Sequence, residues 1–158
     1  MGIGYTHIYT GDGKGKTTCA LGLALRASGA EKRVYIGQFL KDGGYSEIKA
    51  IDKYLPMIKV EQFGKSVSDG YTKAKRALKS GEYDVVILDE INTAVYKGFL
   101  SEQSLLEMID SRPHNVELIL TGRRAAAGVI DKADLVTEML PVKHYFQKGV
   151  CAREGIEK

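Results

Sequence analysis

Short runs of apolar and β-branched residues alternate along the chain with longer segments whose apolar residues recur at helical spacing. Two short runs, VVIL at 85–88 and LIL at 118–120, are apolar at consecutive positions rather than at alternate ones. A strand with this pattern is buried on both faces, as in a parallel sheet covered by helices. The pattern therefore predicts a three-layer α/β domain with a mostly parallel sheet.

The whole chain, residues 1–158, is expected to form a single domain. It contains no internal repeat, linker or low-complexity segment, and its length is near the common size of one domain. Glycines 29 and 81 are suited to helix ends, where a left-handed backbone is common. The predicted strands span 4–10, 33–40, 57–63, 83–90, 116–123, 134–140 and 142–146, and the predicted helices span 16–29, 46–55, 66–81, 101–113 and 125–133.

Polar residues stand at the ends of four predicted strands. Right-handed crossovers place the carboxyl ends of parallel strands at one edge of the sheet. Ligands of open α/β sheets bind at that edge. The segments expected to meet there are the loop from Thr10, Gln38-Phe39, Asp89-Glu90 and Thr121-Gly122-Arg123.

The stretch TGDGKGKTT resembles a phosphate-binding loop, whose pattern is G-x-x-x-x-G-K-[ST]. Gly15, Lys16 and Thr17 supply the last three fixed positions, but the first is Thr10 instead of glycine. The tripeptide follows a predicted strand and opens a predicted helix, which is the context that the motif requires. Two further glycines keep the loop free to adopt a positive φ.

Such a loop has a direct physical use. Consecutive backbone N–H groups form an anion-binding nest, and the helix that follows adds the positive end of its dipole. Lys16 can reach a phosphate oxygen, and the Thr17 hydroxyl can ligate Mg²⁺. Lys14 either touches phosphate or faces solvent, and a glycine-rich turn without a ligand is the alternative for the loop as a whole. The candidate nucleotide-binding residues are Thr10, Gly11, Asp12, Gly13, Lys14, Gly15, Lys16, Thr17 and Thr18.

Two adjacent carboxylates, Asp89 and Glu90, end the buried strand at 83–90. This position is typical of a Walker B site, which holds the same Mg²⁺ that the loop threonine touches. Neighbouring strand residues point to opposite faces, so one carboxylate is expected to face the metal and the other a partner behind it. The sequence leaves open which of the two does so, and either one could instead cap the next helix.

Composition narrows the class of protein. Apolar residues make up 44% and charged residues 27%, and the net charge is only +3, so neither a nucleic acid nor a membrane partner is expected. There are two cysteines and no CxxC pair, which argues against a thiolate zinc site. Cys19, within an apolar helical run, is expected to be a small buried filler. The absence of a secretory leader and of disulfide spacing favours the cytoplasm.

Seven segments occur in an order that closely resembles the P-loop type of ATP:corrinoid adenosyltransferase. Threonine at the first loop position is this family's own form, and the C-terminal segment is the most specific of the seven. The segments are YTGDGKGKTTCALGLALRASG (9–29), QFLK (38–41), VVILDE (85–90), RP (112–113), LILTGR (118–123), ADLVTEM (133–139) and VKHYFQKGVCAREGIE (142–157).

The resemblance implies a RecA-like α/β fold, usually in a homodimer, and a specific reaction. The 5′-deoxyadenosyl group of ATP would move to the cobalt of a corrinoid, and triphosphate would leave. Cobalt must first be reduced to Co(I), so a flavoprotein reductase is an expected partner. Attack at carbon by Co(I) needs no protein base, and the protein's tasks are positioning and stabilisation of the leaving group.

The resemblance also implies roles for residues. Gly11, Gly13, Gly15, Lys16, Thr17 and Thr18 would hold the triphosphate. Thr17 and Glu90 would approach Mg²⁺, with Asp89 behind them. Lys16 and Arg123 are the expected catalytic residues, Arg123 as a further phosphate or nucleotide contact.

Several assignments stay open at this stage. Glu138 and His144 are candidates for the site, for a dimer contact or for a structural role. The chain has no tryptophan, so Phe63, Tyr45 and Tyr71 are candidates for corrinoid contacts or for core packing. An ATPase switch or sensor of the same fold is the alternative function, and a small-molecule kinase is a weaker one.

Overall fold

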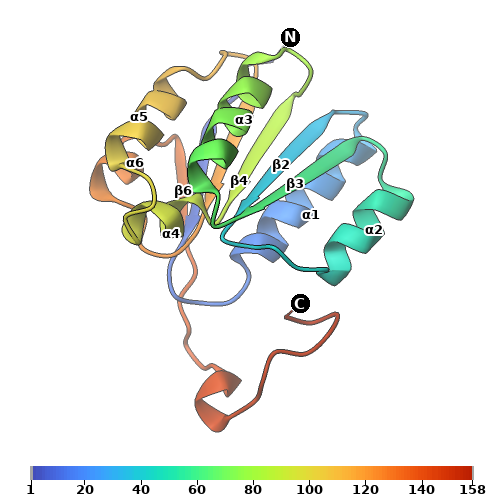
Figure 1. Cartoon of the computed structure of the whole chain (residues 1–158), viewed down its shortest axis with the longest axis vertical. Coiled ribbons are helices and arrows are strands. Elements are labelled where there is room, and N and C mark those ends of the chain that lie inside the picture. The colour runs from blue at the N-terminus through green and yellow to red at the C-terminus, as the bar shows by residue number, and fades with distance from the viewer. Residues whose placement is uncertain (1, 158) are drawn as a thin grey trace.

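The computed structural model describes residues 2–157 and is built on a six-stranded sheet (Figure 1). All paired strands run parallel, in the order β3-β2-β4-β5-β1-β6. The mostly parallel sheet predicted from the sequence is therefore confirmed. The strands are β1 (Thr6–Thr10), β2 (Val34–Phe39), β3 (Ile58–Gly64), β4 (Val85–Asp89), β5 (Glu117–Thr121) and β6 (Leu135–Glu138).

Helices cover both faces of the sheet, which makes the three layers expected (Figure 1). Helices α1 and α2 lie on one face, and α3 to α6 lie on the other. Within the described residues, none of the helices has the length and apolar character needed to cross a bilayer. The helices are α1 (Lys16–Gly29), α2 (Ser46–Tyr54), α3 (Val67–Lys79), α4 (Ile91–Tyr96), α5 (Glu102–Asp110) and α6 (Ala127–Lys132).

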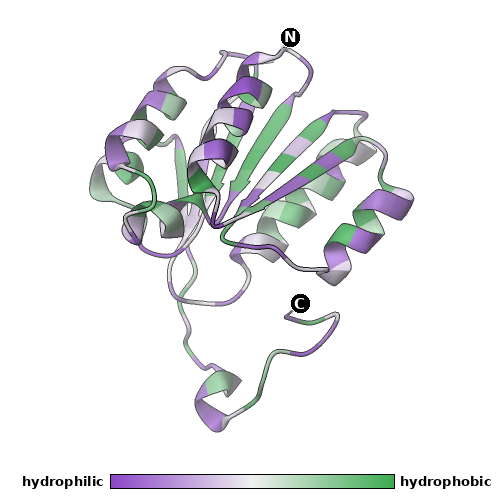
Figure 2. Ribbon diagram, viewed as in Figure 1, coloured by the Kyte–Doolittle hydropathy of each residue, from purple (hydrophilic) through white to green (hydrophobic). Residues whose placement is uncertain are grey.

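The consecutive apolar residues of β4 divide between two cores. Val86 and Leu88 pack with residues of α3 to α6, whereas Val85 and Ile87 pack with α1 and α2. All four are buried, and Figure 2 shows the apolar strands enclosed by helices whose outer faces are hydrophilic. Alternate side chains of a strand point to opposite faces, so a strand between two helical layers needs apolar residues at every position.

Gly70 of α3 gives a direct test of this packing. A Cβ at this position would lie 2.6 Å from the Phe63 ring and 3.0 Å from the Phe39 ring. We expect Gly70→Ala to lower the free energy of unfolding by about 1–3 kcal/mol, because the core must shift to admit the methyl group. Gly22→Ala is the matched control, since no atom lies within 4 Å of its added Cβ and it should stabilise the helix by about 0.5–1 kcal/mol. Urea denaturation measures both, and equal effects of the two changes would contradict the packing.

Two predictions about local structure were wrong, and one helix was missed. Residues 142–146 do not form a strand; the chain leaves the sheet after β6 and makes a short 3₁₀ helix, η1 (Tyr145–Lys148). Pro141 lacks the N–H that a further ladder bond would need. Helix α4 was not predicted, because it begins directly after β4 without a connecting loop. Cys19 is exposed, because the buried face of α1 is carried by the alanines at 20, 24 and 27.

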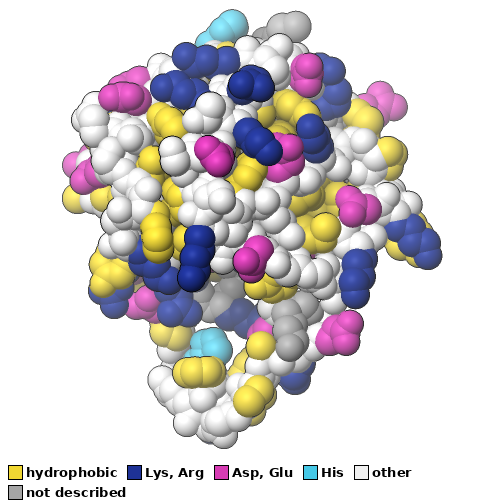
Figure 3. Space-filling view, viewed as in Figure 1, with side chains coloured by type: hydrophobic (Ala, Val, Ile, Leu, Met, Phe, Trp, Pro, Cys, Tyr) yellow, Lys and Arg dark blue, Asp and Glu magenta, His cyan; other side chains and the backbone are white. Residues whose placement is uncertain are grey.

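The C-terminal segment, residues 140–157, extends beyond the carboxyl edge of the sheet (Figures 1 and 3). The Arg153 side chain donates two hydrogen bonds of 3.2 Å to the Glu157 carboxylate, and its backbone N–H donates a third at 2.9 Å. The Tyr145 hydroxyl donates another. These donors lower the pKa of Glu157 to about 2, Arg153 having the largest effect. The cluster closes the segment on itself, while Val142 and Phe146 stay largely exposed.

Candidate nucleotide-binding site

The glycine loop joins β1 to α1 at the carboxyl edge. Gly11 has a φ of 92° and Gly15 a φ of 119°, and these are left-handed values that favour glycine. Thr10 is the last residue of β1 and has an extended backbone that any residue can adopt. Its hydroxyl accepts a hydrogen bond of 3.2 Å from the Ala125 N–H. Threonine at the first position therefore does not disturb the loop, and it ties the loop to the segment that follows β5.

The loop also packs tightly against Met139, which follows β6. The Gly13 N–H donates to the Met139 carbonyl at 2.7 Å, and the Met139 N–H donates to the Thr10 carbonyl at 2.9 Å. A Cβ at Gly11 or Gly13 would lie 2.4 or 2.7 Å from that Met139 oxygen. Close backbone approach therefore requires glycine at both positions, and the left-handed backbone requires it at Gly11 as well.

Lys16 begins α1 and folds back over the loop. Its side chain is buried, and its Nζ donates to the Gly13 carbonyl at 2.7 Å. Burial lowers the pKa of Lys16, and the negative charge of Glu90 opposes that shift. A bound polyphosphate would favour the charged form further. The structure thus holds an ammonium group over the glycine loop at the N-terminus of α1, an arrangement suited to an anion.

Asp89 lies at the centre of a hydrogen-bonded cluster and is 1% exposed. The Thr17 and Thr121 hydroxyls donate to its Oδ1 at 2.9 and 2.6 Å. Its Oδ2 accepts from Lys41 Nζ at 2.7 Å and from Gln38 Nε2 at 3.2 Å. The side chains come from the ends of three adjacent strands and from the first turn of α1, so the parallel sheet brings the cluster together.

The Glu90 carboxylate accepts its hydrogen bond from Thr93 and not from the donors that surround Asp89. The φ of Glu90, 64°, is a left-handed value, rare for a residue with a side chain, which turns the chain sharply from β4 into α4. Its N–H donates to the Thr121 hydroxyl at 3.0 Å, and its carboxylate accepts from the Thr93 hydroxyl at 2.5 Å. The Thr93 hydroxyl also accepts from the Arg123 N–H at 3.0 Å. Glu90 and Arg123 both lie near enough to Lys16 for their charges to act on its pKa, in opposite directions.

The structure brings the predicted loop, both carboxylates and Arg123 to one edge. Asp12, Lys14 and Thr18 of the loop are exposed, as is the Arg123 side chain. Sequence analysis gave no role to Lys41, Thr93 or the Thr121 hydroxyl. Thr121 was expected at this edge, but its hydroxyl was given no contact, and Lys41 could have been noted from its position beyond the end of β2. Thr93 gave no signal, because the helix that carries it was not predicted.

The other candidate residues from the sequence lie in different parts of the structure. Phe63 packs on Phe39 with ring centroids 5.2 Å apart, and Tyr71 donates a hydrogen bond to the Ser104 carbonyl, so both belong to the core. Tyr45 instead faces the site, with Lys41 Nζ 5.5 Å from its ring centroid. The last two candidates, Glu138 and His144, follow β5 in the chain. Glu138 ends β6 beside the loop, whereas the His144 ring accepts a hydrogen bond from the Phe146 N–H and caps the 3₁₀ helix.

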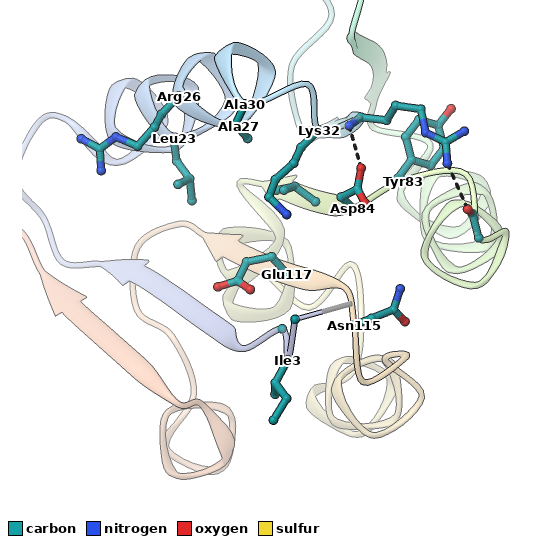
Figure 4. A pocket seen from close by; sticks show the side chains of 15 residues that line it. Ile3, Leu23, Arg26, Ala27, Ala30, Lys32, Tyr83, Asp84, Asn115 and Glu117 are labelled. Atoms are coloured by element: carbon teal, nitrogen blue, oxygen red, sulfur yellow. Dashed lines mark hydrogen bonds between the residues drawn. The ribbon is translucent and has the colours of Figure 1, made fainter.

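A separate hollow of about 480 Å³ lies at the opposite edge of the sheet (Figure 4). It is lined by the last turns of α1 and by residues that precede β1, β2, β4 and β5. Two of its acidic groups are engaged, since Asp84 accepts from the Arg33 N–H at 2.9 Å and Glu117 from His7 at 2.6 Å. None of the predicted site residues lines this hollow.

Residues 3–157 match the family model described as ATP:corrinoid adenosyltransferase BtuR/CobO/CobP. The chain belongs to this family. An adenosyltransferase of this family is an enzyme that uses ATP and a corrinoid, so the resemblance read from the sequence is confirmed.

Curated relatives named corrinoid adenosyltransferases align with almost the whole length of this adenosyltransferase. It is 33% identical over 163 residues to the corrinoid adenosyltransferase of Escherichia coli K12, covering 95% of this chain and 83% of that protein. It is 32% identical over 165 residues to the corrinoid adenosyltransferase of Pseudomonas aeruginosa, covering 95% and 81%. The corrinoid adenosyltransferase CobA of Salmonella typhimurium is 32% identical over 163 residues, with 95% and 83% covered.

Proposed function

We propose that this adenosyltransferase catalyses a single displacement at the ribose C5′ of ATP. The electron pair of Co(I) in a reduced corrinoid forms the cobalt–carbon bond. The bond between C5′ and the triphosphate oxygen breaks, and its electron pair leaves with triphosphate. Cobalt ends formally as Co(III), so one reduced corrinoid is consumed for each ATP.

The observation that carries this proposal is the buried Lys16 over the glycine loop, beside the Asp89 cluster. Charge develops on the triphosphate as the C5′–O bond breaks. The Lys16 ammonium and the positive end of the α1 dipole lie together at the glycine loop, where they would meet that charge without rearrangement. The same groups fix the triphosphate, which positions C5′ for attack. The Co(I) nucleophile carries no proton, so the step requires no base from the protein.

The residues at this edge fit a magnesium ion. Mg²⁺ prefers oxygen ligands, and the Thr17 hydroxyl lies 2.9 Å from a carboxylate oxygen of Asp89. A cationic group already stands against both of these side chains, because Lys41 Nζ contacts them. We assign the metal to Thr17, Asp89 and Glu90. When bound, Mg²⁺ would neutralise part of the leaving group's charge.

The corrinoid is proposed to bind between the turn after β2, residues 43–46, and the C-terminal segment. A hollow of about 330 Å³ lies there, lined by residues 43–46 and by Glu154. Exposed apolar side chains of the segment, including Val142 and Phe146, offer area to a large flat ligand. We also propose a homodimer, a flavoprotein reductase as the source of electrons, and reaction in the cytoplasm.

A product assay tests the function. The protein is mixed in the dark with ATP, Mg²⁺ and chemically reduced cobalamin or cobinamide. We expect a light-sensitive cobalt–carbon product and an equal amount of triphosphate. Orthophosphate release without an alkylated corrinoid would instead support an ATPase switch or sensor. Replacing ATP by ADP is the matched control, because it shortens the leaving group while keeping C5′.

A further inference from the structure

We propose that Lys41 is an internal cation of the nucleotide site. Its ammonium group stands in for the metal between Thr17 and Asp89 in the nucleotide-free protein, and it leaves Asp89 when metal and nucleotide bind together. This inference rests on the proposed magnesium site. It adds an order to loading, because the metal enters with ATP and not before it.

The Lys41 ammonium group contacts both Asp89 and Thr17. Its Nζ lies 2.7 Å from Asp89 Oδ2 and 3.0 Å from Thr17 Oγ1. The Thr17 hydroxyl, in turn, donates to Asp89. Lys41 therefore contacts both of the side chains that would ligate the metal most directly, and one cation position is shared by the lysine and the ion.

Backbone hydrogen bonds around Lys41 fix the turn that carries its side chain to Asp89. Leu40 has a φ of 59°, a left-handed value that is costly for a residue with a side chain. The Leu40 N–H donates to the Gly64 carbonyl at 2.8 Å, and the Gly64 N–H donates to the Lys41 carbonyl at 3.0 Å. This pair of bonds fixes the turn after β2 against the end of β3. The Lys41 side chain is only 16% exposed, so its position is set by the fold rather than by solvent.

The positive charge of Lys41 determines how the site responds to a free divalent ion. Among the described residues that donate to the Asp89 carboxylate, Lys41 is the charged one, and Gln38, Thr17 and Thr121 are neutral. A divalent ion that approached this carboxylate alone would meet the ammonium group at close range, and like charges repel. ATP changes the balance, because its phosphates attract the metal and give the displaced lysine new negative partners. The site should therefore discriminate against free metal.

Manganese binding tests the proposal without using enzyme activity. Mn²⁺ replaces Mg²⁺, and the amplitude of the free-ion electron paramagnetic resonance signal reports binding. In nucleotide-free protein we expect Lys41→Met to bind Mn²⁺ at least 10-fold more tightly than wild type. Lys49→Met, at an exposed lysine of α2, is the matched control and should behave as wild type. The double change Lys41→Met with Asp89→Asn should abolish the gain.

The Mn²⁺ measurements distinguish a failure of the proposed role of Lys41 from a failure of the proposed magnesium site. Equal Mn²⁺ affinity in Lys41→Met and wild type would overturn the role of Lys41, as would a gain that survives Asp89→Asn. Failure of wild type to bind Mn²⁺ with a non-hydrolysable ATP analogue would contradict the magnesium site itself.

A second measurement uses the wild-type protein and does not depend on how the variant folds. The Lys41 ammonium protons should be visible by ¹H–¹⁵N nuclear magnetic resonance, because their hydrogen bonds slow exchange with water. We expect this signal to persist with the metal-free analogue and to shift or vanish when Mg²⁺ is added with it. A signal unchanged by Mg²⁺ would contradict the displacement.

Discussion

Replacing Lys16 by alanine is expected to weaken ATP binding about 100-fold, which corresponds to about 2.7 kcal/mol. The Lys16 ammonium is buried over the glycine loop, and charge-assisted hydrogen bonds to phosphate are worth more than neutral ones. In the free protein Lys16 donates to a neutral backbone carbonyl, so the free energy of unfolding should change by only about 1 kcal/mol. Isothermal titration calorimetry measures the affinity, and urea denaturation measures the stability.

Lys14→Ala is the matched control for this change. Lys14 lies in the same loop with the same charge, but its side chain is exposed. We expect it to lower ATP affinity much less, because an exposed charge is screened by solvent. If both substitutions weaken binding equally, the effect is one of net charge, and the specific role given to Lys16 is wrong.

Asp89→Asn is expected to lower turnover about 1,000-fold and to abolish Mn²⁺ binding in the presence of an ATP analogue. The change keeps the size of the side chain but removes its charge, and it places an amide donor against groups that already donate. Loss of one preorganised electrostatic group at an active site costs about 100- to 1,000-fold in turnover. Loss of the Thr17 orientation supplied by Asp89 adds to this.

Glu90→Gln is the comparison that separates the two carboxylates. Glu90 accepts from Thr93 rather than from Thr17, so its amide variant leaves the Thr17–Asp89 contact in place. We expect Glu90→Gln to retain part of the Mn²⁺ affinity. If Glu90→Gln abolishes metal binding while Asp89→Asn retains it, the order of the two roles is reversed.

The positions of the central strands and of α1 could be predicted because their signals are local. Consecutive apolar residues at 85–88 can be satisfied only between two helical layers, and the predicted helix over 16–29 agrees with α1 at both ends. The strand predicted at 142–146 was wrong because that prediction also used only a local signal. The β-rich composition of these residues does not show whether a neighbouring strand is there to pair with. The exposure of Cys19 depended on which face of α1 the alanines occupy.

By itself, the sequence determined the layered α/β class, the glycine loop between a strand and a helix, the pair of carboxylates at a strand end and, through ordered motifs, the family. The first three follow from periodicity and spacing, which act over a few residues or repeat along the chain, and the family follows from the resemblance of the ordered motifs. Only the tertiary structure decided that Asp89 faces Thr17, that Glu90 turns to Thr93, and that Lys41 joins the cluster. Those contacts join residues 3 to 72 positions apart and depend on strand register and on two left-handed turns, at Leu40 and Glu90, which no local pattern specifies.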